Sequence, residues 1–191
     1  MKENASHQEL HWLYLLQQGD HQALALIMEK YYTALYNYGS KFTRDEELVK
    51  DSIQEVFISL WQRRGDATAI LSPRYYLLRA VKNKVLKSTH RNAWITDSLQ
   101  VEKEYDFFHE FSIEKIIIEK QLSEEKAIKL KRIVSLLSRR QHEIIYLKYF
   151  QHLDHGQIAE LMNITTQSVY NLLHETIQKL KTVWHSEFVS R

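Results

Sequence analysis

The sequence predicts an all-α protein: two small helical domains joined by an acidic linker, the second of them a helix-turn-helix domain. Apolar residues recur at the spacings of three and four that mark one face of a helix. Only four glycines and one proline interrupt the 191 residues. Nine acidic and three basic residues fall between Asp97 and Glu125, which indicates a linker there. We expect domains at 1–92 and 123–191, with the linker at 93–122.

Apolar stripes place the helices of the first domain. After a frayed start at 1–6 we expect helices over about 7–18, 20–42, 49–61 and 73–91, with a loop at 65–71. Asp20 is suited to cap the second helix. Thr43 and Glu46 form a plausible capping box for the third, and Gly65 a stop after it. Ser72-Pro73 is a start signal for the fourth.

The helix at 49–61 has two contrasting faces. Its apolar stripe comprises Val49, Ile53, Val56, Phe57, Leu60 and Trp61. Asp51, Gln54 and Glu55 lie on the opposite, outward side. An ordinary solvated surface would explain this pattern, and so would a docking face for a basic partner. From this segment alone both interpretations stay open.

The helix that follows Pro73 is basic along its length. No acidic residue occurs between Ala67 and Thr96, whereas six basic residues do: Arg74, Arg79, Lys82, Lys84, Lys87 and Arg91. Ordinary solvated faces mix both signs of charge. Tyr75 and Tyr76 fall in the first turn, and cations beside aromatic rings are what single-stranded nucleic acid requires. The alternative is that both tyrosines are half-buried packing residues at the helix entry.

The second domain carries the pattern of a helix-turn-helix. Ser138 with Gln141, and Asp154 with Gln157, are capping boxes for two successive helices. Next come the expected core positions: Ile158, Ala159, Met162, Ile164, Val169 and Leu172. Asn163 sits at the turn, where its tolerance of the left-handed conformation substitutes for glycine.

The second helix of this motif is the expected duplex-reading element. Either Thr165 or Thr166 caps it. Its outward residues are Gln167, Ser168, Tyr170, Asn171 and His174. Between Gln167 and Lys181 the net charge is only plus one, so this helix is expected to hold duplex DNA weakly by itself. A helix-turn-helix used mainly as a protein surface is therefore the alternative.

Three sequence segments resemble segments of bacterial RNA polymerase sigma factors of the extracytoplasmic-function group. They are D-x-I-Q-E-V-F from Asp51, S-P-R-Y-Y-L-L-R-A-V-K-N-K from Ser72, and L-S-R-R-Q-H-E-I-I-Y-L-K-Y-F from Leu137. The resemblance spans Gly19 to about Lys181. The sequence departs from it at Tyr170 and Glu175, where basic residues are usual, and at His142, where an arginine is expected.

The resemblance implies a role for each region. Asp51, Gln54 and Glu55 would contact core polymerase, with Phe57 packing behind them. The residues implied for the minus-ten element are Arg74, Tyr75, Tyr76, Arg79, Lys82, Asn83 and Lys87, and the loop 65–71 would capture a flipped base. Those implied for the minus-thirty-five element are Thr165, Thr166, Gln167, Ser168, Tyr170, Asn171 and His174. An anti-sigma factor is implied as a further partner.

Composition excludes several other classes. There is no cysteine, the ten histidines are scattered, and no phosphate-binding loop or nucleophile motif occurs. We therefore expect no metal, no cofactor and no catalysis. No apolar run is long enough to span a membrane, so a cytoplasmic protein is expected. The rival functions are a helix-turn-helix transcriptional regulator acting without polymerase attachment, and a helical scaffold that binds no DNA.

Overall fold

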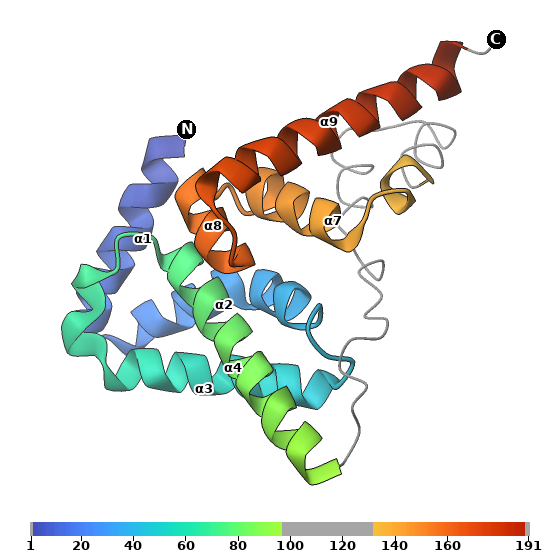
Figure 1. Ribbon diagram of the computed structural model, residues 1–191. Helices are drawn as coiled ribbons and strands as arrows, with labels where there is room; N and C mark the ends of the chain where they lie inside the picture. Colours follow the sequence, from blue (N-terminus) through green and yellow to red (C-terminus); the bar gives the residue numbers. More distant parts are fainter. Residues whose placement is uncertain (1, 97–131, 190–191) are drawn as a thin grey trace. The chain divides into compact units, whose positions relative to one another are not determined.

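The chain folds into two compact helical units, Met1–Tyr105 and Asp106–Arg191. The computed structural model describes residues 2–96 and 132–189, and the side chains of 7–89 and 132–186 (Figure 1). Within these ranges there are helices and no strands, so the predicted all-α, two-domain fold is confirmed. The predicted linker at 93–122 lies almost wholly outside the described residues, and the domain limits stay a prediction.

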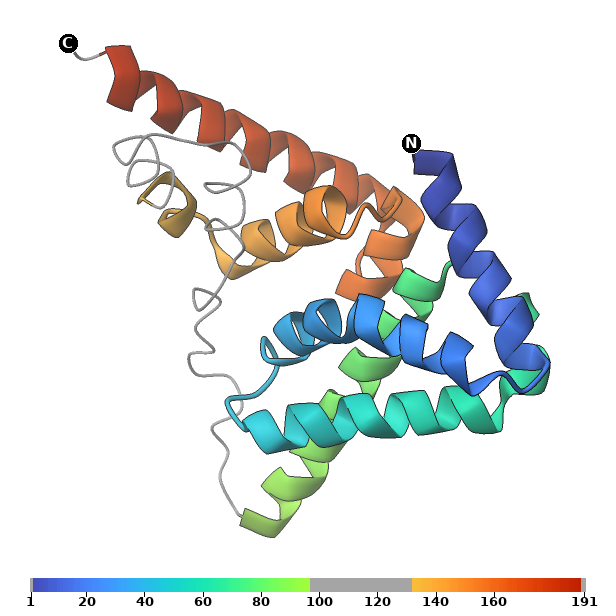
Figure 2. The ribbon, with the colours of Figure 1, turned by 180° about the vertical axis from the view of Figure 1, so that it is seen from behind.

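Four α-helices and one short 3-10 helix make up the described part of unit 1. They are α1 (Lys2–Gln17), α2 (His21–Gly39), α3 (Glu46–Gln62), η1 (Arg64–Ala69) and α4 (Pro73–Thr96). Both ribbon views show α4 crossing α3 (Figures 1 and 2). Each of these two helices also packs against α2, while α1 packs against α2 and η1. The result is a bundle in which α3 and α4 share one core.

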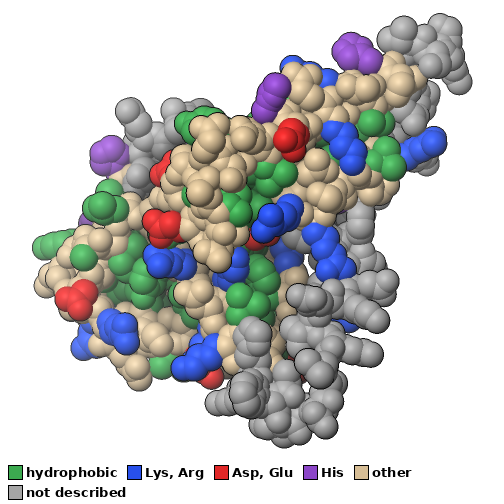
Figure 3. Space-filling view, in the orientation of Figure 1, with side chains coloured by type: hydrophobic (Ala, Val, Ile, Leu, Met, Phe, Trp, Pro, Cys, Tyr) green, Lys and Arg blue, Asp and Glu red, His purple; other side chains and the backbone are tan. Residues whose placement is uncertain are grey.

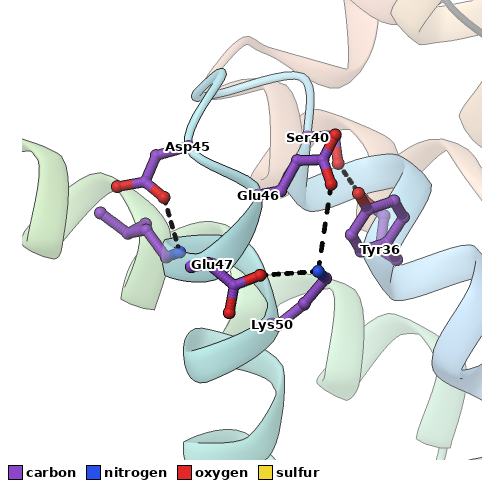
Figure 4. A network of polar contacts seen from close by, with 7 residues as sticks. Tyr36, Ser40, Asp45, Glu46, Glu47 and Lys50 are labelled. Carbon is purple, nitrogen blue, oxygen red and sulfur yellow. Dashed lines mark hydrogen bonds and ion pairs between the residues drawn. The ribbon is translucent and has the colours of Figure 1, made fainter.

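The start of α3 differs from the prediction. Asp45, and not Thr43, is the N-cap: its carboxylate accepts a hydrogen bond of 3.0 Å from the backbone N–H of Leu48 (Figure 4). The Thr43 hydroxyl is buried and accepts from the backbone N–H of Asp45, at 3.1 Å. The predicted capping box of Thr43 and Glu46 is therefore wrong, because the helix begins at Glu46 itself.

Several other helix boundaries differ from the prediction. Helix α1 begins at Lys2, where a frayed tail was expected, and α4 continues past Arg91 to Thr96. Helix α3 ends at Gln62, one residue beyond the predicted end at Trp61. The expected loop at 65–71 contains most of η1. The cap of α2 is as predicted, since the Asp20 carboxylate accepts from the backbone N–H of Gln22 at 2.7 Å.

Helices α2, α3 and α4 approach one another closely at Gly39, the last residue of α2. A Cβ placed there would lie 2.9 Å from Cγ1 of Val49 on α3 and 3.2 Å from Cγ1 of Val81 on α4. Both valines are fully buried. Since β-branched side chains are stiff at χ1, neither can easily turn away. The missing side chain at Gly39 therefore lets three helices meet at one point.

Unit 2 contains the predicted helix-turn-helix. Its described helices are α7 (Arg139–Ile145), the π-helical turn η2 (Tyr146–Phe150), α8 (His155–Met162) and α9 (Thr166–Val189). Both predicted capping boxes, Ser138 with Gln141 and Asp154 with Gln157, are present. Asn163 has φ 52° and ψ 51°, the left-handed conformation expected at the turn. The π-helical turn was not predicted.

The core of unit 2 follows the prediction with small shifts. Ile158, Ala159, Met162 and Val169 are buried. Ile164 and Leu172 are only half-buried, whereas Leu173, next to Leu172, is buried. The expected helix before Ser138 begins outside the described residues; at its end Ile133 and Leu137 are buried.

Substituting Gly39→Ala tests this close approach. We expect the free energy of unfolding to fall by about 1–3 kcal/mol, because the added methyl group overpacks the core. The gain in helix propensity, about 0.5–1 kcal/mol, acts in the opposite direction and is smaller. Urea denaturation followed by circular dichroism measures the change. Gly65→Ala is the matched control, since no atom lies within 4 Å of its added Cβ. Equal stability of the two variants would contradict the packing described here.

Candidate docking and nucleic-acid interfaces

The outward face of α3 is formed by Asp51, Gln54 and Glu55, all exposed as predicted. Phe57 lies on the other side of the helix and is only 2% exposed, which agrees with its expected packing role. Ile58 adds an exposed apolar side chain to the outward side. The outward side of α3 therefore combines two negative charges, an amide and one apolar group.

A polar network sits at the start of α3 (Figure 4). Lys50 Nζ lies 2.7 Å from Oε1 of Glu47 and 4.0 Å from Oε2 of Glu46. The hydrogen bond to Glu47 raises the pKa of Lys50, so this lysine stays charged. Partial desolvation and the Glu46 carboxylate raise the pKa of the Tyr36 phenol. Lys50 therefore partly neutralises the negative charges of Glu46 and Glu47 in the first turn. The outward face of α3 begins at the next residue, Asp51.

One contact joins this face to α4. Glu55 forms an ion pair with Lys84, through Oε2 and Nζ. The side chains remain 52% and 40% exposed, respectively. Glu55 is therefore accessible to a partner while it holds a cation of the neighbouring helix. This contact was not predicted, because it depends on how α3 and α4 cross.

The two tyrosines in the first turn of α4 are half-buried, not fully exposed. Nη1 of Arg79 donates a hydrogen bond of 3.0 Å to the Tyr75 hydroxyl, and its guanidinium carbon lies 5.9 Å from the ring centroid. Tyr75 and Arg79 therefore act as one unit with an aromatic face and a positive charge. The space-filling view shows Lys and Arg side chains over unit 1, with hydrophobic side chains between them (Figure 3).

The other predicted residues of α4 divide into two groups. Arg74 and Lys82 lie over aromatic rings of the protein: Arg74 Cζ is 5.7 Å from the Tyr31 centroid, and Lys82 Nζ is 5.3 Å from that of Phe42. Such contacts hold a cation in a defined position. Asn83 and Lys87 are exposed. The predicted residues therefore gather along one helix, with some oriented by the core.

In unit 2, all seven predicted residues at the start of α9 are exposed: Thr165, Thr166, Gln167, Ser168, Tyr170, Asn171 and His174. Thr165 is the cap, since its hydroxyl accepts from the backbone N–H of Ser168 at 3.1 Å and Thr166 is the first helical residue. Nε2 of Gln167 donates to Oδ1 of Asn171, at 3.0 Å. These linked amides present hydrogen-bonding groups of the kind that read base edges.

Two histidines have roles that the sequence did not indicate. The ring of His155, at the start of α8, meets the Tyr170 ring edge-on, with 4.2 Å between centroids. This contact orients an otherwise exposed tyrosine of α9. His142 replaces an expected arginine and is buried, with Nδ1 3.0 Å from the Ser138 carbonyl oxygen. It therefore packs within the unit and is not a surface contact.

Comparison with known proteins decides the family. Residues 27–95 match the model of Sigma-70 region 2, and residues 127–180 match that of Sigma-70, region 4. Together the two matches cover more than half of the chain. The chain belongs to the sigma-70 family. Sigma-70 proteins direct RNA polymerase to promoters, so the predicted function of a transcription initiation factor is confirmed at this level, and a regulator acting without polymerase is not favoured.

One solved structure similar to the chain is described as "Structure of CnrH in complex with the cytosolic domain of CnrY". The sequences are 14% identical, the TM-score is 0.51, and the alignment covers 93% of this chain and 97% of that chain. At this identity the match supports the fold alone. No curated protein matches the sequence.

The described residues also bear on membrane insertion and metal binding. None of the described helices is both long enough and apolar enough to cross a membrane. Among the same residues, no three histidine, aspartate or glutamate side chains are grouped as a metal site.

The Glu55–Lys84 ion pair can be measured by a double-mutant cycle with Glu55→Gln and Lys84→Met. Because both side chains are substantially exposed, we expect a coupling energy of about 0.5 kcal/mol at low salt and almost none at about 1 M salt. Urea denaturation of the four proteins gives the value. A coupling that persists in high salt would contradict an exposed pair, and no coupling at low salt would show that the contact does not form in solution.

Proposed function

We propose that the chain is a sigma factor of the extracytoplasmic-function group, which attaches to core RNA polymerase through α3 and engages promoter DNA through α4 and α9. The observation that carries the proposal is the pairing of two faces on one unit: a negative outward face on α3 and a basic face on α4. The predicted domains at 1–92 and 123–191, joined by a predicted linker at 93–122, suit this group.

Asp51, Gln54 and Glu55 would contact a basic surface of core polymerase. Their exposure supports this role, as does the burial of Phe57, which anchors the helix from behind. Charged residues at a docking surface chiefly set the rate and orientation of association. Loss of one of them should therefore weaken attachment without unfolding the helix.

The minus-ten residues would hold separated strands. Tyr75 with Arg79 offers a ring for stacking and a cation for the phosphate beside it. Arg74, Tyr76, Lys82, Asn83 and Lys87 would extend this surface along α4. Because no acidic residue occurs from Ala67 to Thr96, the backbone of a strand meets no repulsion from this segment.

The start of α9 would read the minus-thirty-five duplex. Its linked amides, Gln167 and Asn171, support base-edge contacts, and Tyr170 offers an apolar contact to a thymine methyl group. The weak positive charge predicts that unit 2 needs the rest of the assembly to stay on DNA. Attachment to polymerase would keep unit 2 on the duplex.

Partners and location follow from the same proposal. In the similar solved structure, CnrH is in complex with the cytosolic domain of CnrY. We infer that this chain likewise takes a protein partner, an anti-sigma factor, which would limit its access to polymerase. A factor that works on polymerase would act in the cytoplasm. It would need no cofactor, and it would catalyse no reaction itself.

The decisive experiment adds the purified chain to core polymerase and a promoter library. We expect sequence-selective transcription that needs both components. Arg79→Glu should slow promoter opening by about tenfold, because a phosphate contact becomes a repulsion, while binding to core polymerase stays near wild type. Permanganate reactivity of unpaired thymines measures opening.

Lys181→Glu is the matched control, since it reverses one exposed charge on α9 beyond the residues proposed to read DNA. We expect it to leave opening nearly unchanged. Three results would contradict the proposed division of roles. They are transcription without promoter selectivity, DNA binding that needs no polymerase, and an equal loss of promoter opening and polymerase binding in Arg79→Glu.

A further inference from the structure

Helix α1 lies outside the region 2 match, which begins at residue 27. It nevertheless packs directly on η1, the segment that the family resemblance associates with a flipped base (Figure 2). Leu13 and Leu16 of α1 are fully buried, and Ala67 of η1 is 1% exposed. Apolar burial therefore fixes the two elements together. Polar contacts also join them to each other and to their neighbours.

Gln17, the last residue of α1, makes the clearest of these contacts. Its side-chain Nε2 donates a hydrogen bond of 2.6 Å to the carbonyl oxygen of Gly65. On the other side, Trp61 stacks on His21, with 4.1 Å between centroids, and the Arg64 guanidinium lies 4.7 Å from the Trp61 ring. The start of η1 is thus held between the end of α1 and the end of α3.

Glu9 forms a second link, from α1 to α2. Its Oε1 lies 2.7 Å from Nζ of Lys30, and the Glu9 side chain is only 14% exposed. The next residue of α2, Tyr31, has a buried phenol. Burial and the Glu9 carboxylate raise the pKa of this phenol, whereas Arg74 lowers it. Arg74 lies over the Tyr31 ring and directly precedes Tyr75. Glu9 and Arg74 therefore contact neighbouring residues of α2, Lys30 and Tyr31, which connects α1 to the start of α4 through α2.

We propose that α1 is a positioning element for strand capture, which holds η1 through Gln17 and, by way of the contact of Glu9 with α2, the first turn of α4. Neither residue touches DNA in this account. They keep η1 and Tyr75 in the geometry that accepts unpaired bases. The cost of losing either should therefore appear in single-strand affinity and not in attachment to polymerase. This inference rests on the proposed function.

The test uses the full chain assembled with core polymerase. The probe is the non-template single strand of a promoter recovered in the library assay, and the readout is its dissociation constant from the assembly. We expect Glu9→Gln and Gln17→Ala to weaken binding by about three- to tenfold each, the range for loss of one hydrogen-bonded contact. Affinity for core polymerase should stay at the wild-type value, and the midpoint of thermal unfolding should fall by no more than about 5 °C.

Matched controls separate positioning from general electrostatics. Glu29→Gln removes the same charge from an exposed site on α2, and Gln18→Ala shortens the exposed neighbour of Gln17. Removing a negative charge should by itself strengthen DNA binding slightly, so opposite signs for Glu9→Gln and Glu29→Gln would identify positioning.

Two results would overturn the inference: single-strand affinity unchanged in both variants, or a parallel loss of polymerase affinity and thermal stability. If the wild-type assembly itself held no single strand, the proposed function would fail with it; if the wild type bound and the variants matched it, only the role of α1 would fall.

Discussion

The close approach of three helices at Gly39 is the constraint on which unit 1 depends. Because α2 carries no side chain there, Val49 of α3 and Val81 of α4 reach the same point of the core. Because side chains are tightly packed at this point, α3 and α4 cannot slide or rotate freely against each other. The outward face of α3 and the basic face of α4 are therefore fixed relative to each other, and the Glu55–Lys84 ion pair spans the boundary between them.

Local signals in the sequence predicted most of the fold. Capping boxes at Ser138 and Asp154 involve residues three apart, so their chemistry can be recognised without tertiary information. Asn163 at the turn is another such case. The exposure of Asp51, Gln54 and Glu55 followed from helical spacing alone, since a buried stripe defines the opposite face.

The remainder depended on contacts between distant segments. Asp45 and Thr43 are both good capping residues, and burial of the Thr43 hydroxyl decided that Asp45 caps α3. Helix η1 forms in a stretch that reads as a loop, because α1 supplies a packed surface for it. The contacts of Glu9 with Lys30 and of Arg74 with Tyr31 join three helices through α2, and no spacing in the sequence indicates them.

In the proposed assembly, one rigid unit contacts polymerase with α3 and DNA with α4. Site-specific photo-crosslinking tests it most directly, with a photoreactive residue in place of Gln54 or Asn83, both exposed. In an assembly of chain, core polymerase and promoter DNA, Gln54 should crosslink to polymerase and Asn83 to the non-template strand. Crosslinks from Gln54 to DNA, or from Asn83 to polymerase alone, would contradict the account.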